Sequence, residues 1–431
     1  MTLVEKAIAR ACGRDEVSPG DIVIAKVDLA FAHDSSGARR WRPMLEDLGV
    51  GLWDPSKVAI ISDHYVPAVD LETAAILQDT RQFVETYKVG NFYDMVGICH
   101  LVLPEHGMIR PGAFIAGGDS HTPTAGAFGA YAAGYGATDM GAIVATGETW
   151  LQVPATIKVE LNGKIPMGVT AKDVMLFLCA RLGMDNAFRA VEFSGDTVRA
   201  MSMSERMVLC NMAAEMGAET GVVAPDQVTF DYLARVGRPV EDQAAALAFA
   251  SDPDAAYLAV HSFDASELQP QIAAPHNPGN THDVATHAGV RIDQAYIGAC
   301  VGAKIEDLRM AAEVLRGNKV APHVRLLIAP ASSKTTLAAA QEGVMADLLA
   351  AGATLLGSGC GACAGYGAGI VAAGEVCISS TNRNFKGRMG HSEASVYLGS
   401  PYSVAAAAIA GHITDPRAFL DADGLSLKGA A

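Results

Sequence analysis

Apolar and polar positions along the chain follow two periods, one typical of buried strands and one typical of amphipathic helices. Short runs of β-branched and other apolar residues predict strands at 21–27, 58–62, 112–117, 157–161 and 324–329. Apolar residues spaced by three and four predict helices at 2–14, 70–88, 138–149, 171–182 and 334–351. Because strands and helices alternate, we predict an α/β protein with largely parallel sheets.

The periodicity weakens between residues 262 and 293, where Pro270, Pro275 and Pro278 interrupt the pattern. Such a segment is typical of a linker. We therefore predict two α/β/α lobes over residues 1–284 and a third α/β/α lobe over residues 285–431. A chain of 431 residues, half of them hydrophobic, is long enough for about two to three domains with large cores.

Composition and charge narrow the class of function. With a formal net charge of −15, the chain lacks the overall basic surface of a nucleic-acid-binding protein. The N-terminus does not have the pattern of a signal peptide, and no run approaches the roughly 20 apolar residues of a membrane span. Several of the eight cysteines lie in apolar surroundings, so we expect reduced thiols rather than a disulfide framework. We therefore expect a cytoplasmic protein.

Three cysteines in the last third of the chain form the first candidate site. Cys360 and Cys363 form a C-x-x-C pair in a glycine-rich turn, and Cys300 lies at a predicted strand-to-helix turn. The pair alone is compatible with half a zinc site, a redox pair or two buried thiols. A third thiol favours an iron–sulfur cluster in which one iron stays open for substrate. Cys377 lies in an alternating strand pattern, so we expect it in the core.

Histidines, with aspartates beside two of them, gather at or after predicted strand ends in the first part of the chain. The group consists of Asp63, His64, His100, Asp119, Ser120 and His121. The carboxyl ends of parallel strands are where α/β folds place their sites. A histidine near a carboxylate can serve as a general acid or base. We therefore expect acid–base chemistry at these strand ends.

A polar loop and an apolar helical stretch add charged candidates. Arg383 and Arg388 stand five positions apart in a glycine-containing loop after a predicted strand. Arginine pairs bidentately with carboxylates, so the loop is a candidate clamp for a diacid, although an isolated pair at this spacing is more often a solvated loop. Glu215 lies in the apolar stretch 208–216, where a buried carboxylate needs a partner. It is either a perturbed acid or a member of a structural ion pair.

Longer motifs carry a resemblance that covers residues 21–415. They lie at 97–100, 118–122, 297–300 with 305–308, and 374–377 leading into 382–390. With them the chain resembles the aconitase superfamily, most closely large subunits of the 3-isopropylmalate dehydratase, homoaconitase and dimethylmalate dehydratase type. The resemblance implies three α/β/α lobes around a central 4Fe–4S cluster, without the swivel domain.

The resemblance also implies roles for individual residues. The cluster ligands would be Cys300, Cys360 and Cys363, with Asn211 and Asn382 beside the cluster. The catalytic pairs would be Asp63 with His64, His100 with Asp119, and His121 with Glu215. The substrate would be bound by Arg383, Arg388, Ser120 and His33.

In this family a serine on the swivel domain removes the substrate proton. The resemblance therefore implies a separate small subunit that carries this domain and contacts the variable side group of the substrate. The expected activity is that of a hydro-lyase acting on a small 2-hydroxy-diacid. The substrate stays open among 3-isopropylmalate, 2,3-dimethylmalate, citramalate with citraconate, malate with maleate, and homocitrate with homoaconitate.

Two other classes of function remain as weaker alternatives. A cluster-sensing RNA-binding protein is disfavoured by the net charge of −15 and by the retained histidine and arginine set. A dinucleotide-binding oxidoreductase built on the glycine-rich run 357–369 lacks a clean G-x-G-x-x-G motif with a following acidic residue.

Four positions depart from the family pattern. Val301 and Gly302 follow the first cluster cysteine, where Thr-Asn is usual. Ala362 stands in place of a proline, and Leu101 follows His100 where glutamine is common. We expect the lost polar groups to change hydrogen bonding around the cluster, and with it the cluster's potential and stability.

Overall fold

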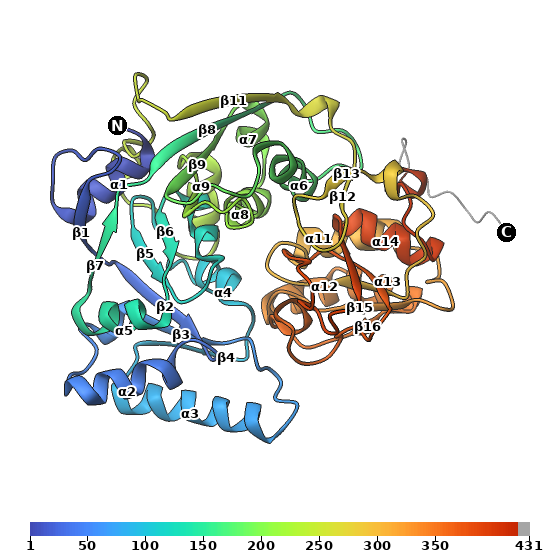
Figure 1. Cartoon of the computed structure of the whole chain (residues 1–431), viewed down its shortest axis with the longest axis horizontal. Coiled ribbons are helices and arrows are strands. Elements are labelled where there is room, and N and C mark those ends of the chain that lie inside the picture. Colours follow the sequence, from blue (N-terminus) through green and yellow to red (C-terminus); the bar gives the residue numbers. More distant parts are fainter. Residues whose placement is uncertain (421–431) are drawn as a thin grey trace.

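The computed structural model describes residues 1–420, which form three α/β units, each built on one large sheet (Figure 1). Residues 421–431 of the predicted third lobe lie outside the described residues. In Figure 1 the first two units, coloured blue to green, occupy the left of the molecule, and the third unit, yellow to red, lies on the right. The expected three-lobed α/β architecture with largely parallel sheets is confirmed.

The first sheet has five parallel strands in the order β4-β3-β2-β5-β6. They are β2 (Leu29–His33), β3 (Val58–Ser62), β4 (Asn91–Asp94), β5 (Phe114–Gly117) and β6 (Tyr131–Gly134). Every residue of β2, β3 and β5 is buried, because both faces of a parallel sheet are covered. The helices that share a core with this sheet are α1 (Leu3–Cys12), α2 (Ala38–Leu48), α3 (Leu71–Tyr87) and α5 (Ala137–Thr146). An antiparallel ribbon of β1 (Ile22–Lys26) and β7 (Glu148–Gln152) completes the unit.

The second sheet is also parallel and has four strands in the order β10-β9-β8-β11. They are β8 (Ala155–Asn162), β9 (Arg189–Ser194), β10 (Thr220–Val223) and β11 (Ala259–Asp264). The helices of this unit are α6 (Ala171–Leu182), α7 (Asp196–Ala200), α8 (Met203–Met212), α9 (Gln227–Arg235) and α10 (Gln243–Leu247). Helix α8 packs on segment 122–128 of the first unit, and α6 packs on two strands of the third sheet. The second unit therefore bridges the other two.

The third sheet has seven strands in the order β13-β12-β18-β17-β14-β15-β16, parallel except at β12 and β13. The strands are β12 (Gln271–Ala273), β13 (Thr281–Asp283), β14 (Gln294–Ile297), β15 (Arg325–Ile328), β16 (Thr354–Leu355), β17 (Val376–Ser379) and β18 (Ser395–Leu398). The helices are α11 (Ile305–Leu315), α12 (Ser333–Gln341), α13 (Val344–Ala351) and α14 (Pro401–Ala410). Apart from these, a short helix α4 (Cys99–Glu105) in the first unit follows β4.

Three local predictions were wrong for identifiable reasons. The predicted helix 334–351 is two helices, because Gly343 adopts a left-handed conformation with φ of 79° between them. The predicted helix 138–149 ends at Thr146, where Gly147 turns the chain into β7. The predicted linker contains β12 and β13, because its prolines flank these strands instead of interrupting them. The lobe boundary at residues 284 and 285 stays a prediction.

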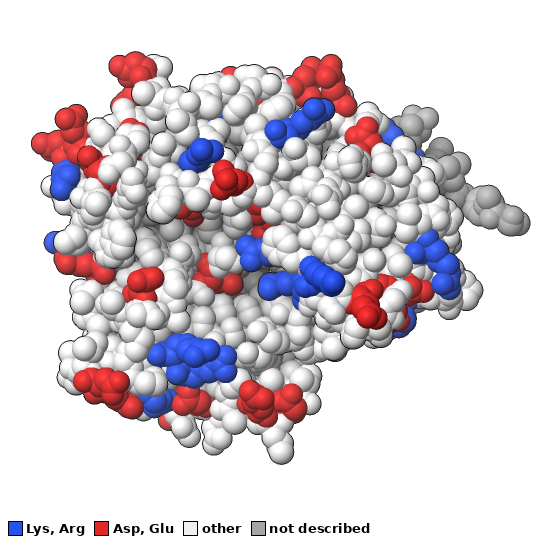
Figure 2. Space-filling model, viewed as in Figure 1, with Lys and Arg blue, Asp and Glu red and all other residues white. Residues whose placement is uncertain are grey.

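The loops that follow the strands of the first and third sheets meet each other. The backbone N–H of Cys360 donates to the carbonyl oxygen of Asp63 at 2.8 Å, and that of Ile98 donates to Ala331 at 2.9 Å. Figure 2 shows a hollow in this face of the molecule, with basic side chains on one side and acidic side chains on the other. The carboxyl ends of both sheets therefore point to a shared cleft, where α/β folds place their sites.

Candidate active site

The turn after β3 holds Asp63 and His64 against the end of β2. Nδ1 of His64 lies 2.7 Å from Oδ1 of Asp63, and the rings of His64 and His33 stack with centroids 3.7 Å apart. The carboxylate of Asp34 accepts the backbone N–H groups of His64 at 3.0 Å and Tyr65 at 2.9 Å. The side chains of both histidines and both aspartates are buried. Two adjacent strand ends thus fix the orientation of the His64 imidazole.

The surroundings of His64 favour its protonated form. Burial by itself would lower the pKa of His64, but the charge of Asp63 and the hydrogen bond to it, helped by Asp119 and Asp34, raise this pKa to about 9. Burial would likewise raise the pKa of Asp63, yet the charge of His64 holds it below its ordinary value. At neutral pH His64 therefore carries a proton that it can donate to a leaving group.

Asp119 joins three histidines at the end of the same sheet. Its Oδ1 lies 2.7 Å from Nε2 of His100 and 3.5 Å from Nδ1 of His121, and its Oδ2 lies 3.5 Å from Nε2 of His33. Burial would raise the pKa of Asp119, but the charge of His100 and bonds from all three rings hold it well below its ordinary value. Asp119 therefore stays ionised and orients the rings around it. Ser120 beside it is exposed.

Glu215 brings the second and third units into the site. It follows α8, and its Oε1 lies 2.9 Å from Nε2 of His121 and 2.6 Å from Nε of Arg383. Burial would raise the pKa of Glu215, but the charges of His121 and Arg383 lower it to about 2. Its other oxygen, Oε2, is buried without a hydrogen-bond partner within residues 1–420. Glu215 is thus an ionised member of a buried charge network that joins all three units.

The arginine loop after β17 presents two guanidinium groups in different surroundings. Arg383 is held by its Nε to Glu215, which leaves its terminal Nη groups without a hydrogen-bond partner in the described part of the chain. Arg388 makes no ion pair among residues 1–420, and its buried Nε has no partner there. Buried donors are normally satisfied, so the free guanidinium donors of this loop are available to a bound anion.

Three cysteines and Asn382 of the third unit form one contiguous group with Asn211 of the second unit. Cys360 and Cys363 lie on a tight turn in which the N–H of Cys363 donates to the carbonyl oxygen of Cys360 at 3.1 Å. The Oδ1 atom of Asn382 lies 3.7 Å from Sγ of Cys300 and 4.0 Å from Sγ of Cys363. The Nδ2 group of Asn211, at the end of α8, donates to Sγ of Cys300 at 3.1 Å. The five residues named by the resemblance are therefore neighbours.

The three thiols fit an iron–sulfur cluster. They make no disulfide, and burial raises the pKa of Cys300 to about 12 and those of Cys360 and Cys363 above their ordinary value. In the free protein they therefore hold their protons. Metal ions bind the thiolate form and displace those protons, so bound iron would supply the positive charge that stabilises buried thiolates. Cys377 lies fully buried in β17, which confirms its expected place in the core.

Two side-chain groups bring ligand atoms within 4.8 Å of one another without thiols. One group consists of His33, Asp34, Asp63 and His64, and the other of His100, Asp119 and His121. Three of these histidines, His64, His100 and His121, already lie within hydrogen-bond distance of a carboxylate. We therefore interpret both groups as acid–base pairs rather than as cation sites.

Sequence reasoning missed two buried charged residues of the site. Asp34 follows β2 as Asp63 follows β3, and that shared strand-end position was the available signal. Lys172 lies in the first turn of α6 and donates to the carbonyl oxygen of Thr381 at 2.6 Å. Burial lowers the pKa of Lys172 to about 8. A lysine at the start of an amphipathic helix resembles a solvated residue, and only the contact between units buries it.

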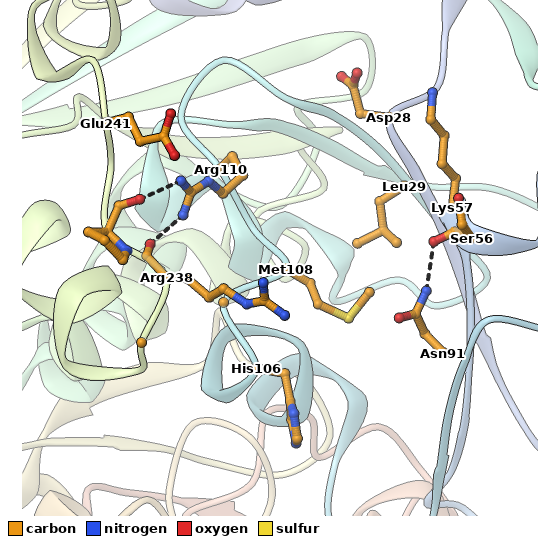
Figure 3. Close-up of a pocket in the computed structure, with 13 residues that line it drawn as sticks. Asp28, Leu29, Ser56, Lys57, Asn91, His106, Met108, Arg110, Arg238 and Glu241 are labelled. Carbon is orange, nitrogen blue, oxygen red and sulfur yellow. Dashed lines mark hydrogen bonds between the residues drawn. The ribbon is translucent and has the colours of Figure 1, made fainter.

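A separate cavity of about 560 Å³ lies at the opposite, amino ends of β2, β3 and β4 (Figure 3). The loop 237–241 closes one side, where Arg110 donates to the carbonyl oxygen of Pro239 at 2.7 Å. Charged side chains of both signs line it, among them Lys57, Arg238 and Glu241. It contains none of the sequence-predicted site residues. We therefore place the chemistry in the cleft between the units.

Within residues 1–420, no helix combines the length and the apolar character needed to cross a lipid bilayer.

Comparisons with known proteins identify the family to which the chain is similar. Residues 57–411 match the model of the Aconitase family (aconitate hydratase). The chain is 47% identical to 3-isopropylmalate dehydratase large subunit 1 of Methanopyrus kandleri, over 97% of this chain and 99% of that one. It is 43% identical to the probable methanogen homoaconitase large subunit of Methanothermobacter thermautotrophicus, over 97% and 98%. Among solved structures, Thermococcus kodakaraensis aconitase X (holo-form) is similar with a TM-score of 0.47 at 15% identity, over 84% of each chain.

Proposed function

Because the chain belongs to the aconitase family, we propose that it is the large subunit of a hydro-lyase that removes water from, and returns it to, a small 2-hydroxy-diacid. The proposed activity is of the 3-isopropylmalate dehydratase type. One observation carries the proposal: three histidine–carboxylate pairs, three cysteine thiols and two arginines lie where the three units meet. We infer that the protein acts in the cytoplasm on a soluble substrate.

For the cofactor, the proposal is a 4Fe–4S cluster held by Cys300, Cys360 and Cys363. Three protein ligands would leave one iron open, and such an iron supplies Lewis-acid chemistry toward a hydroxyl and a carboxylate. Asn211 and Asn382 lie beside the sulfur atoms, where their amide groups would tune the cluster by hydrogen bonding.

The chain's own side chains would bind the diacid and move one proton. Arg383 and Arg388 have free donor groups that match two carboxylates. Eliminating water requires that the departing hydroxyl receives a proton, and His64 holds one at neutral pH. The carbon-bound proton would leave to a serine of the small subunit, as the resemblance implies. Asp119 and Glu215 would keep His100 and His121 in fixed orientations.

We expect the alkaline limit of activity to follow His64. Since the pKa of His64 is raised to about 9, kcat/KM should be maintained below that pH and fall as the pH rises through it. Asp63→Asn removes the charge that raises this pKa, and burial would then bring it below its ordinary value. At about pH 7.5 the kcat/KM of the variant should be roughly tenfold or more below that of the wild type, because a change of one pKa unit changes the protonated fraction by up to a factor of ten. The measurement is a pH profile of kcat/KM.

Glu85→Gln, on the exposed side of α3, is the matched control for loss of one carboxylate and should leave the profile unchanged. An alkaline limb that stays at the same pH in Asp63→Asn would remove His64 from the role of acid.

The two arginines should contribute a similar factor to kcat/KM for every diacid substrate. Each guanidinium–carboxylate contact contributes about 1.5–3 kcal/mol, so Arg383→Lys and Arg388→Lys should each lower kcat/KM about 10- to 150-fold. Lysine is a poor substitute because it cannot bind a carboxylate bidentately. The order of preference among diacids and the iron content should not change. Lys386→Ala, an exposed change in the same loop, is the control. A variant that altered the preferred diacid while keeping its rate would contradict this assignment.

The proposed function is tested by loading the purified chain with iron and sulfide without oxygen and adding the small subunit. About four iron atoms per chain are expected. The panel consists of 3-isopropylmalate, 2,3-dimethylmalate, citramalate, malate and homocitrate, and the alkene product is followed by its ultraviolet absorbance. Turnover of one member supports the proposal and identifies the substrate. Iron loading without turnover of any of them, together with tight RNA binding by the iron-free chain, would favour the RNA-binding alternative.

A further inference from the structure

The ammonium group of Lys172 is buried without an ionic partner. The residue is 2% exposed, and its Nζ donates one hydrogen bond, to the carbonyl oxygen of Thr381. An ammonium has three donors, yet no carboxylate oxygen of residues 1–420 lies within 4.0 Å of this one. An isolated buried charge is costly, so the position calls for an anion.

The other buried basic side chains of the described residues show the usual solution. Arg206 lies 2.7 Å from a carboxylate oxygen of Asp226, and Lys304 lies 2.7 Å from one of Asp307. Both are as deeply buried as Lys172. Lys172 is therefore the exception among the three, and its missing partner is a property of its own surroundings.

Most acidic groups around Lys172 are already paired with another cation or carry no charge. Burial is the main cause of the lowered pKa of Lys172, and the acidic groups that counteract it are Glu215 and, were they ionised, the thiols of Cys363, Cys179 and Cys300. Glu215 already neutralises two cations, His121 and Arg383. Burial raises the pKa of Cys179 far above neutrality, so this thiol is uncharged. Glu205, Glu306 and Asp307 line the same small void as Lys172, but among the described residues none of their carboxylates forms an ion pair with it. The two cysteines proposed to bind the cluster are therefore the remaining candidates.

The contacts of Lys172 also lead to these cysteines. Its acceptor, Thr381, directly precedes Asn382, whose Oδ1 lies near the sulfur atoms of Cys300 and Cys363. Lys172 also lines a small void together with Val301, the residue after Cys300. Lys172, on α6 of the second unit, therefore places a positive charge beside the loops of the third unit that carry the thiols.

We propose that Lys172 is a positioning residue that serves as the counter-ion of the iron–sulfur cluster. This inference rests on the proposed function, because it needs a cluster on Cys300, Cys360 and Cys363. A cluster with three thiolate ligands is anionic, and reduction adds a further electron. A fixed cation beside it stabilises the reduced form more than the oxidised form, so it raises the reduction potential.

The test compares the loaded wild-type protein with Lys172→Met and Lys172→Arg by a redox titration followed by electron paramagnetic resonance. In Lys172→Met the one-electron reduction equilibrium should become about tenfold less favourable, which corresponds to a potential about 59 mV lower. Lys172→Arg should restore most of this difference. Lys164→Met, an exposed change in the same unit, has the same effect on net charge and should leave the potential unchanged.

Thermal unfolding separates this role from a simple structural one. In the iron-free chain, Lys172→Met removes an unpaired buried charge and should raise Tm. In the loaded chain it also removes the partner of the cluster, so the gain should shrink or reverse. A loss of Tm that is equal in both forms, with an unchanged potential, would make Lys172 only an anchor for Thr381 and overturn the proposal.

Should Lys172→Met fail to fold, Lys172→Gln keeps a donor for Thr381 without the charge and carries the same expectations. If the wild-type chain takes up no iron at all, the proposed function itself fails, and that result is visible before any variant is measured.

Discussion

Replacing Cys300, Cys360 or Cys363 with serine is expected to abolish both the brown colour of the reconstituted protein and its activity. The three sulfur atoms would be the only protein ligands of the cluster, and a serine hydroxyl is a poor ligand for iron in such a site. Because the thiols hold their protons in the free protein, the variants should fold without iron. Visible absorbance, iron content and turnover would be measured on the same preparations.

Cys377→Ser is the matched control for this series. Cys377 is a free thiol like the three proposed ligands, but it is fully buried within β17 and does not lie in a loop of the cleft. Its loss should cost some stability and leave iron content unchanged. Retention of about four irons by any of the three proposed ligand variants, or a colourless protein that binds stoichiometric zinc, would refute the assignment.

The chain without its partner should show no turnover of any hydroxy-diacid, even when it is fully loaded with iron. Two relatives named as large subunits match this chain over nearly their whole length. The group that takes the carbon-bound proton is expected on the small subunit. The isolated chain can bind the diacid through Arg383 and Arg388 and protonate a hydroxyl through His64, but elimination would lack its base. Titration with the small subunit should restore activity and saturate at a fixed ratio of the two chains.

A chimeric pair sharpens this second prediction. Combining the chain with the small subunit of a relative that accepts another diacid should change the order of substrate preference, because the variable side group is expected to contact that subunit. The arginine variants should not have this effect. Robust turnover by the isolated chain would contradict the division of the active site between two proteins.

The sequence by itself determined the class of fold and the chemical types of the site. Strands such as 58–62 are buried on both faces, so a continuous apolar run predicts them without knowledge of the neighbouring strands. Polar residues that directly follow such strands, among them Asp63 and His64, are brought to the sheet edge by local geometry alone. The C-x-x-C turn of Cys360 and Cys363 is equally local. The family resemblance then related these separate segments to one another.

Only the tertiary structure decided how residues far apart in sequence pair. The contact between Glu215 and Arg383 spans 168 positions, and no local pattern indicates whether a glutamate in an apolar stretch meets a cation. The burial of Lys172 could not be predicted for the same reason, since the burial of a helix's first turn depends on which unit packs against it. The pairing of β1 with β7 and the inclusion of β12 and β13 in the third sheet likewise depend on partners elsewhere. Side-chain period and turn chemistry act over a few residues, whereas burial, counter-ions and strand partners are set by contacts that form only when the three units pack together.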